Sequence, residues 1–121
     1  SGSGSTSDAI EALEYAVAMG AQISNNSYGG DPFSQSFYNA IANARDAGHI
    51  FVAAAGNNGA NNDTSPFFPA NYELDNVVSV AATDDRDQWA YFSNYGQATV
   101  EEAAAAAVAR TREFFNPAAQ P

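Results

Sequence analysis

Apolar residues recur at helical spacing in two segments of the chain. The recurring positions are Ile10, Leu13, Ala16 and Val17 in the first segment and Phe37, Ile41 and Ala44 in the second. A cluster of Ser, Thr and Asp precedes the first segment, which is typical of a helix N-terminus. Gly20 and Gly48 follow the last apolar positions, and glycine commonly ends a helix. The pattern predicts one helix before Gly20 and a second from about residue 34 to Gly48.

Three short apolar runs alternate with these helices, at residues 21–25, 50–55 and 76–82. The second run is apolar throughout, as is typical of a strand buried on both faces. A strand, a helix and a strand joined by short connections predict neighbouring parallel strands. The chain is therefore expected to have an α/β fold built on a parallel sheet.

The C-terminal segment has a different composition. Thr99 and Glu102 form a capping-box pattern, which is followed by five alanines, two arginines and a proline. Acidic residues early and basic residues late suit the helix dipole, and proline ends such a run. We expect a helix over residues 101–115. The chain then divides into a domain at 1–100 and an alanine-rich helical tail at 101–121, with a packing or capping role for the tail.

Charge and composition narrow the classes of partner. The 121 residues carry fourteen acidic and four basic side chains, a formal net charge of −10. Such a surface repels phosphate backbones and anionic lipid, so no nucleic-acid or membrane partner is expected. The absence of cysteine from the sequence excludes disulfides and thiolate chemistry. No apolar run is long enough to span a bilayer, and the first residues show no signal-peptide pattern.

The sequence shows no self-sufficient catalytic set. His49 is the one histidine, and it lies between Gly48 and the apolar run at 50–55, where a structural role is expected. A Ser-His-Asp relay needs a nucleophile beside its base, and no serine occurs in a Gly-Thr-Ser or Gly-x-Ser-x-Gly context. One histidine without cysteine also argues against a catalytic metal site.

Glycines and side-chain amides follow the first two apolar runs. The sequence is Asn-Asn-Ser-Tyr-Gly-Gly at 25–30 and Ala-Ala-Ala-Gly-Asn at 53–57. In open parallel sheets, ligand sites gather at the carboxyl ends of the strands. Glycine lets a ligand backbone approach closely, and an asparagine amide can donate to a developing negative charge. The alternative is that these residues only serve turns. Neighbouring strands would bring Gly29 and Gly56 together at one edge of the sheet.

Six motifs occur in order along residues 1–100. They are Ser-Asp-Ala-Ile-Glu-Ala (7–12), Asn-Asn-Ser-Tyr-Gly-Gly (25–30), Val-Ala-Ala-Ala-Gly-Asn (52–57), Phe-Pro-Ala-Asn-Tyr (68–72), Asn-Val-Val-Ser-Val-Ala-Ala (76–82) and Phe-Ser-Asn-Tyr-Gly (92–96). Together they closely resemble the subtilase family of serine endopeptidases. The resemblance implies a three-layer, partial subtilisin-like fold, with a mainly parallel sheet flanked by helices, in an extracellular protein. It also implies an extended peptide or protein substrate that lies across the strand ends.

The resemblance implies roles for individual residues. Asn57 would be the oxyanion-hole donor, whose amide stabilises the tetrahedral intermediate. The substrate residue before the scissile bond would enter a pocket with two walls. One wall would be Ser27, Tyr28 and Gly29, and the other Ala54, Ala55 and Gly56. The backbone of Gly2, Ser3 and Gly4 would pair with the substrate, which adds a strand at this edge. Small walls together with Tyr28 favour a roomy apolar pocket. This chemistry requires no cofactor.

A structural calcium site is also implied by the resemblance. Ala70, Tyr72 and Asp84 fall where members of the family often hold a cation with carbonyls and a carboxylate. Ca²⁺ favours such oxygen ligands. Occupancy varies within the family, and an empty loop is the alternative.

Three segments typical of the family do not occur in these residues. They are Asp-Thr/Ser-Gly, His-Gly-Thr and Gly-Thr-Ser-Met-Ala, which supply the catalytic Asp, His and Ser. Two functions therefore stay open. The chain is part of a subtilisin-like endopeptidase and inactive alone, or it is a non-catalytic α/β module that binds an extended peptide or is purely structural. In either case we expect uncovered apolar surface at Val77 and Val80, which favours self-association.

Overall fold

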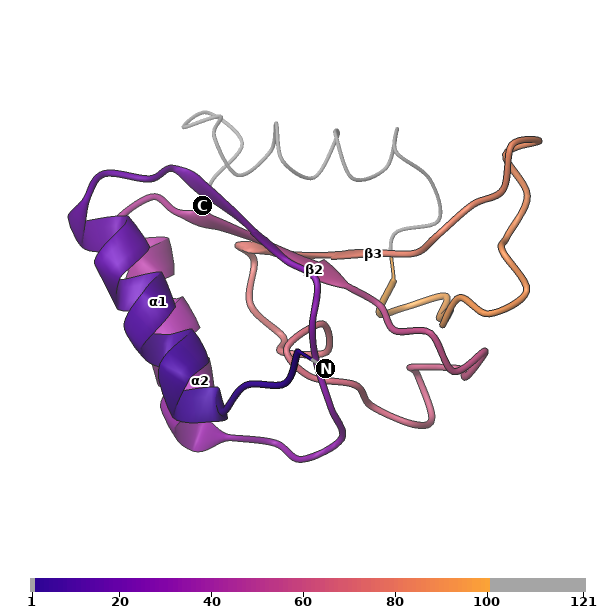
Figure 1. Cartoon of the computed structure of the whole chain (residues 1–121), viewed down its shortest axis with the longest axis horizontal. Helices are drawn as coiled ribbons and strands as arrows, with labels where there is room; N and C mark the ends of the chain where they lie inside the picture. The colour runs from indigo at the N-terminus through magenta and orange to yellow at the C-terminus, as the bar shows by residue number, and fades with distance from the viewer. Residues whose placement is uncertain (1, 101–121) are drawn as a thin grey trace.

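The computed structural model describes residues 2–100, in which two helices pack against a three-stranded sheet (Figure 1). In chain order the elements are α1 (Thr6–Ala18), β1 (Ile23–Asn26), α2 (Gln35–Asp46), β2 (Ile50–Ala54) and β3 (Val77–Val80). β2 lies between β1 and β3, and both neighbours run parallel to it. The expected α/β class and parallel sheet are confirmed. The helix expected at 101–115 lies outside the described residues.

The start of α1 is fixed by a capping box around Ser5. The Ser5 hydroxyl accepts a hydrogen bond from the Asp8 N–H at 3.2 Å, and the Ser5 N–H donates to the Asp8 carboxylate at 3.4 Å. These two bonds satisfy backbone donors that have no partner within the helix. Gly20 follows the helix with a φ of +86°, a conformation that favours glycine. The polar cluster and the glycine stop thus predicted both ends of α1.

α2 is bounded by the same kinds of signal. The Ser34 hydroxyl accepts a hydrogen bond from the Phe37 N–H at 3.2 Å at the start of the helix. Gly48 follows the helix with a φ of +81°. The buried residues of α2 are Phe37, Ala40, Ile41 and Ala44. Their spacing of three and four puts them on one face, as the apolar periodicity predicted.

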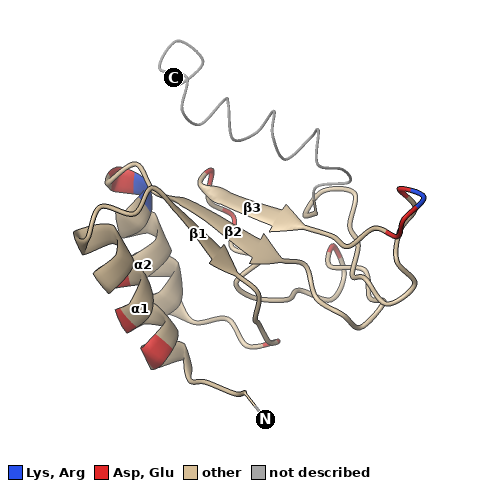
Figure 2. Cartoon of the chain, turned by 45° about the horizontal axis from the view of Figure 1, so that its top comes forward, with Lys and Arg blue, Asp and Glu red and all other residues tan. Residues whose placement is uncertain are grey.

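One core lies between the helices and the sheet. Phe51 and Ala53 of β2 are fully buried, and they belong to one cluster with Leu13 of α1 and Ile41 of α2. Both helices therefore cover the same face of the sheet, as Figure 2 shows. Within the described residues no helix covers the opposite face. The third layer implied by the resemblance is thus not present within residues 2–100.

The apolar surface at the sheet differs in part from the expectation. Val77 is only 4% exposed and belongs to the core, so the expectation that it is uncovered was wrong. Val80, at the end of β3, is 36% exposed, and Ile23 of β1 is 55% exposed. β1 and β3 are the edge strands of the described sheet. Some apolar surface therefore remains at both edges.

His49 has the structural role that its position predicted. It is 1% exposed, with Nδ1 2.8 Å from the Ala21 carbonyl oxygen and Nε2 2.8 Å from the Ser24 hydroxyl. Because a carbonyl can only accept, Nδ1 donates to Ala21, and Nε2 is left to accept from Ser24. The ring thereby ties the beginning of β2 to β1.

Acidic side chains are spread over the surface of the described residues. Figure 2 shows them on α1 and on the loop that follows β3, where the sequence has Arg86 among three aspartates. Basic side chains do not gather into a patch anywhere in residues 2–100. None of the described helices has the length and apolar character needed to cross a membrane.

Candidate functional site

The segments that follow β1 and β2 emerge at the same edge of the sheet. The strands are parallel, and Asn26 at the end of β1 pairs with Ala53 near the end of β2. A Cβ placed on Gly29 would lie 2.7 Å from Cζ of Phe67, and one placed on Gly56 would lie 3.4 Å from Cδ1 of the same ring. Gly29 and Gly56 therefore both lie against the ring of Phe67. The predicted proximity of these glycines is confirmed.

Phe67 contacts both glycines, and sequence reasoning missed this residue. Its ring is partly buried, and its N–H donates to the Asn71 side-chain oxygen at 3.1 Å, which fixes the backbone at this point. The sequence predicted a roomy apolar pocket between the wall at 27–29 and the wall at 54–56, because the residues of both walls are mostly small. The Phe67 ring lies against a glycine of each wall. A signal was present in the run Pro66-Phe67-Phe68-Pro69, but nothing in that run indicated which ring would turn toward the strand ends.

A groove of about 770 Å³ runs beside the first of these segments. Its lining includes Gly2, Ser3, Gly4, Ser27, Tyr28 and Gly29, together with the start of α1 and the side chains of Phe68 and Tyr72. Six of the nine residues predicted to bind substrate therefore line one continuous hollow. Its mixture of backbone, hydroxyl and aromatic surface suits an extended peptide.

The second predicted wall is placed differently. Ala54, Ala55 and Gly56 are not among the residues that line this groove. Ala55 is 1% exposed, its N–H donates to the Val80 carbonyl at 2.9 Å, and its carbonyl accepts from the Asn62 amide at 2.9 Å. Ala55 is thus part of the sheet interior, and the Phe67 ring lies against one glycine of each wall.

Tyr28 is held by a hydrogen bond at the edge of the groove. Its hydroxyl donates to the Asn26 side-chain oxygen at 2.9 Å, and the Asn26 amide donates to the Val52 carbonyl at 3.1 Å. Burial raises the pKa of the Tyr28 hydroxyl above its usual value. The hydroxyl therefore remains protonated at neutral pH and keeps its role as donor.

Asn57 lies in an exposed turn directly after β2. Gly56 precedes it with a φ of +117°, which is accessible almost only to glycine. Within the described residues the Asn57 side chain has no hydrogen-bond partner, so its amide can donate to a bound group. The oxyanion-hole role that the resemblance implies for Asn57 needs such an unpaired amide at the end of a strand, and it stays a prediction.

The residues predicted to hold calcium do not form a cluster of charged side chains. Asp84 is exposed, and one of its carboxylate oxygens accepts from the Arg86 N–H at 2.8 Å and the Gln88 N–H at 3.0 Å. Ala70 and Tyr72 are buried, and the Tyr72 carbonyl accepts from the Leu74 N–H at 2.9 Å. Residues 2–100 contain no group of three His, Cys, Asp or Glu side chains placed to hold a metal ion. A carbonyl-based calcium site therefore stays a prediction.

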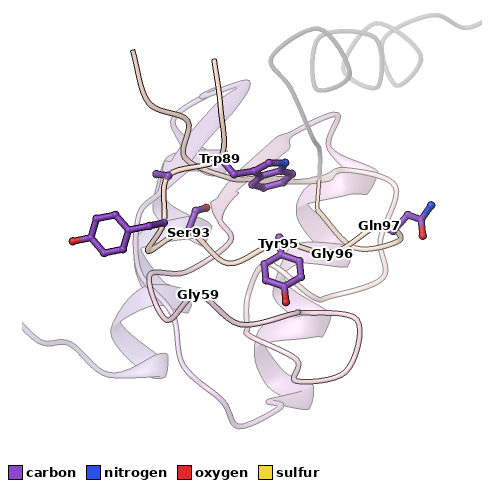
Figure 3. Close-up of a pocket in the computed structure, with 8 residues that line it drawn as sticks. Gly59, Trp89, Ser93, Tyr95, Gly96 and Gln97 are labelled. Atoms are coloured by element: carbon purple, nitrogen blue, oxygen red, sulfur yellow. The ribbon is translucent and has the colours of Figure 1, made fainter. Parts of the chain in front are cut away.

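A second hollow, of about 450 Å³, lies beside residue 59, two positions after Asn57 in the chain. It is lined in part by Gly59, and Figure 3 shows the side chains of Trp89, Ser93, Tyr95 and Gln97 around it. The Ser93 hydroxyl is occupied, because it donates to the Asn94 carbonyl at 2.9 Å and accepts from the Ala82 N–H at 2.9 Å. Ser93 is also buried, and both of its hydrogen-bond partners are backbone groups and not a base.

These features define an α/β protein with a peptide-sized groove and an exposed amide at the strand ends, and comparison with known proteins identifies its family. Residues 1–112 match the family model described as the Subtilase family. The Thermophilic serine proteinase of Bacillus sp. (strain AK1) is 45% identical over 95 residues, which cover 78% of this chain and 22% of that protein. Thermitase of Thermoactinomyces vulgaris is 38% identical over 96 residues, which cover 79% of this chain and 33% of that protein.

Solved structures agree with this assignment. A cold-adapted subtilisin-like serine proteinase matches with a TM-score of 0.69 and 31% identity, covering 80% of this chain and 34% of that one. The Prenylagaramide maturation protease matches with a TM-score of 0.70 and 31% identity, covering 80% of this chain and 35% of that one. The chain belongs to the subtilase family. It spans 22% and 33% of the length of the two relatives named above.

Proposed function

We propose that this chain forms the substrate-binding and oxyanion-hole part of a subtilisin-like serine endopeptidase, with Asn57 as the oxyanion donor. The observation that supports this proposal most directly is the exposed Asn57 amide directly after β2, at the edge of the sheet where Ser27–Gly29, which line the groove, also emerge. Ligands of parallel sheets bind at this edge.

The proposed chemistry divides between binding and charge stabilisation. The backbone of an extended substrate pairs with residues 2–4, and its side chains enter the groove beside Tyr28. The Asn57 amide donates to the oxygen of the scissile carbonyl, and the bond strengthens as negative charge develops on that oxygen. The nucleophile and base come from parts of the catalytic domain other than these residues. We therefore expect no hydrolysis by the 121-residue chain alone, and serine-specific labelling of it by a fluorophosphonate probe would contradict this.

A chimeric enzyme tests the role of Asn57. Residues 1–100 replace the matched segment of Thermitase, and the chimera is compared with its Asn57→Ala variant. The known effect of losing an oxyanion-hole donor in a subtilisin is a fall in kcat of about 10²–10³-fold, and we expect a loss of that size with little change in KM. Asn58→Ala is the matched control, because Asn58 is the exposed neighbour of the same type. Equal kcat values for the two variants would refute the proposal.

The same chimera tests the effect of Phe67 on substrate choice. Because the Phe67 ring contacts both Gly29 and Gly56, we expect a preference for a small side chain before the scissile bond. Phe67→Ala should raise kcat/KM for a substrate with a large apolar residue there, relative to one with alanine. An unchanged ratio would show that this ring does not limit the pocket.

A non-catalytic peptide-binding function is the second candidate. It is favoured by one observation, namely that residues 2–4 and 27–29 line one groove within the described part of the chain. Saturable binding of an extended peptide to the isolated chain would support this function, provided that Gly4→Pro, which blocks backbone pairing with residues 2–4, abolishes the binding.

By family membership we also propose an extracellular location and a calcium site at Ala70, Tyr72 and Asp84. A rise in Tm on adding Ca²⁺ that Asp84→Asn abolishes would support the calcium site, and no rise would exclude it.

A further inference from the structure

Two buried asparagines lie beneath the turn that carries Asn57. Asn62 is 0% exposed and Asn94 is 1% exposed. A buried side-chain amide is costly unless its donors and acceptor are paired. The partners of these two amides therefore indicate why the structure keeps polar groups there.

The two amides form a continuous chain of hydrogen bonds. The Asn94 side-chain oxygen accepts from the Asn58 N–H at 2.8 Å and from the Ala60 N–H at 3.1 Å. The Asn94 amide nitrogen donates to the Asn62 side-chain oxygen at 3.0 Å. The Asn62 amide nitrogen donates in turn to the Ala55 carbonyl at 2.9 Å. The chain thus connects the residue before Gly56 with the residue after Asn57.

The orientation of both amides follows from their partners. Two backbone N–H groups face one end of the Asn94 side chain, so that end has to be the oxygen. The nitrogen then faces Asn62, whose own nitrogen has to face the Ala55 carbonyl. A flipped amide would place donors against donors. Only one arrangement satisfies every group.

Backbone contacts hold the same residues in place. The Asn94 N–H donates to the Gly56 carbonyl at 2.9 Å, and the Asn62 N–H donates to the Tyr95 carbonyl at 2.7 Å. A Cβ on Gly56 would collide with the Asn94 side-chain amide. Gly56 therefore packs directly against the Asn94 side chain, which leaves no room for a Cβ at this position.

We propose that Asn94 and Asn62 form a positioning clamp that fixes the turn at residues 56–58 and thereby presents the Asn57 amide at the strand end. The clamp affects catalysis only through Asn57, so this part of the proposal rests on the proposed function of Asn57 as the oxyanion donor. Neither residue would touch the reacting atoms. Their effect is to hold the donor in place before substrate binds, since preorganised donors stabilise developing charge without a reorganisation cost.

Amide hydrogen exchange of the full 121-residue chain, followed by NMR, tests the clamp. In the unmodified protein the Asn58 and Ala60 amides should both be protected more strongly than the Asn57 amide, because both donate to the Asn94 side-chain oxygen. Asn94→Ala should lower the protection of Asn58 and Ala60 by about tenfold or more relative to the amides of β2, as expected for loss of a net-stabilising hydrogen bond. It should also shift the resonances of the Asn57 side-chain amide.

Asn76→Ala is the matched control. Asn76 is 0% exposed, and its amide donates to the carbonyls of Ile41 and His49, away from the turn. This variant should lower stability throughout the core while leaving the Asn57 resonances and the relative protection of Asn58 unchanged. If Asn94→Ala behaves in the same way as Asn76→Ala, the asparagines serve stability only and the clamp is refuted.

A second variant tests whether the two amides act together. Asn62→Ala should lower the protection of Asn58 by less than Asn94→Ala does. The double variant should be no worse at Asn58 than Asn94→Ala, because Asn62 is connected to the Asn58 N–H only through Asn94. Independent, additive effects would contradict this. Should Asn94→Ala fail to fold, rapid exchange of Asn58 and Ala60 in the unmodified chain would still refute the clamp. Exchange does not depend on kcat, so the clamp can stand even if Asn57→Ala leaves the chimera fully active.

Discussion

The segments that follow β1 and β2 reach the same edge of the sheet, but different bonds hold them there. The first is held by backbone pairing, because the Gly30 N–H donates to the Phe68 carbonyl at 2.8 Å and the Phe68 N–H donates back at 2.7 Å. The second segment has backbone bonds as well, such as the one from the Asn94 N–H to the Gly56 carbonyl at 2.9 Å, but it depends in addition on the side-chain amides of Asn62 and Asn94. Backbone pairing survives most substitutions, whereas a side-chain bond is lost with one. We therefore expect residues 55–60 to be the more sensitive segment.

The largest effect is expected from Gly56→Ala. The new Cβ would collide with the Asn94 amide at a φ of +117°, so steric overlap and backbone strain both oppose folding. We expect a loss of about 3 kcal/mol in the free energy of unfolding. Gly20→Ala is the control, because Gly20 has a φ of +86° but no atom within 4 Å of its Cβ position. It should cost about 1 kcal/mol. If urea unfolding gives the same loss of free energy for Gly56→Ala and Gly20→Ala, the contact between Gly56 and Asn94 does not add to the cost of the substitution.

A smaller difference in the free energy of unfolding is expected when a side-chain hydrogen bond is removed from each of the two segments. Asn94→Ala leaves the N–H groups of Asn58 and Ala60 and the Asn62 oxygen without a partner, at a cost of about 2 kcal/mol. Tyr28→Phe removes a single bond, to Asn26, from a side chain that is 42% exposed, and should cost about 0.5 kcal/mol. Chemical unfolding of both variants gives the comparison. A larger loss for Tyr28→Phe would reverse the ranking of the two segments.

The smallest effect is a pH dependence at Asp63, which anchors residues 97–99. Its exposed carboxylate accepts from the Thr99 hydroxyl at 2.7 Å and from the Gln97 N–H at 2.9 Å. The Thr99 bond, helped by the neighbouring backbone N–H groups, lowers the pKa of Asp63 below its ordinary value of 3.8. A lowered folded-state pKa stabilises the fold above that value, and the contribution is lost as the pH falls through the folded pKa.

NMR of the Gln97 and Thr99 amides from about pH 2 to about pH 6 would follow this loss. We expect their resonances to shift together below the ordinary pKa of the carboxyl and to be insensitive to pH above it. Asp63→Asn should abolish the titration while keeping an acceptor oxygen. Resonances that move only above about pH 5 in the unmodified chain would assign the effect to another group.

Local signals predicted much of the fold. The polar residues before α1 and α2 and the glycines after them act within a few positions along the chain, so both helices were recovered. Strand ends were less accurate. The run at 21–25 corresponds to β1 at Ile23–Asn26, and the run at 76–82 corresponds to β3 at Val77–Val80. Their bounds depend on pairing with β2, which an isolated apolar run does not encode.

The sequence by itself determined the α/β class, the family motifs and the proximity of Gly29 and Gly56, because strand-helix-strand order and a glycine-bearing strand end are local patterns. Only the tertiary structure decided which groups surround Asn57. Phe67 lies 38 positions from Gly29 in number, and Asn94 is 36 positions from the Asn58 N–H that it binds. In the sequence, a buried asparagine such as Asn94 cannot be told from an exposed asparagine in a turn, because its burial depends on residues that are distant along the chain. Long-range partners, which loop closure brings together, gave these residues their roles.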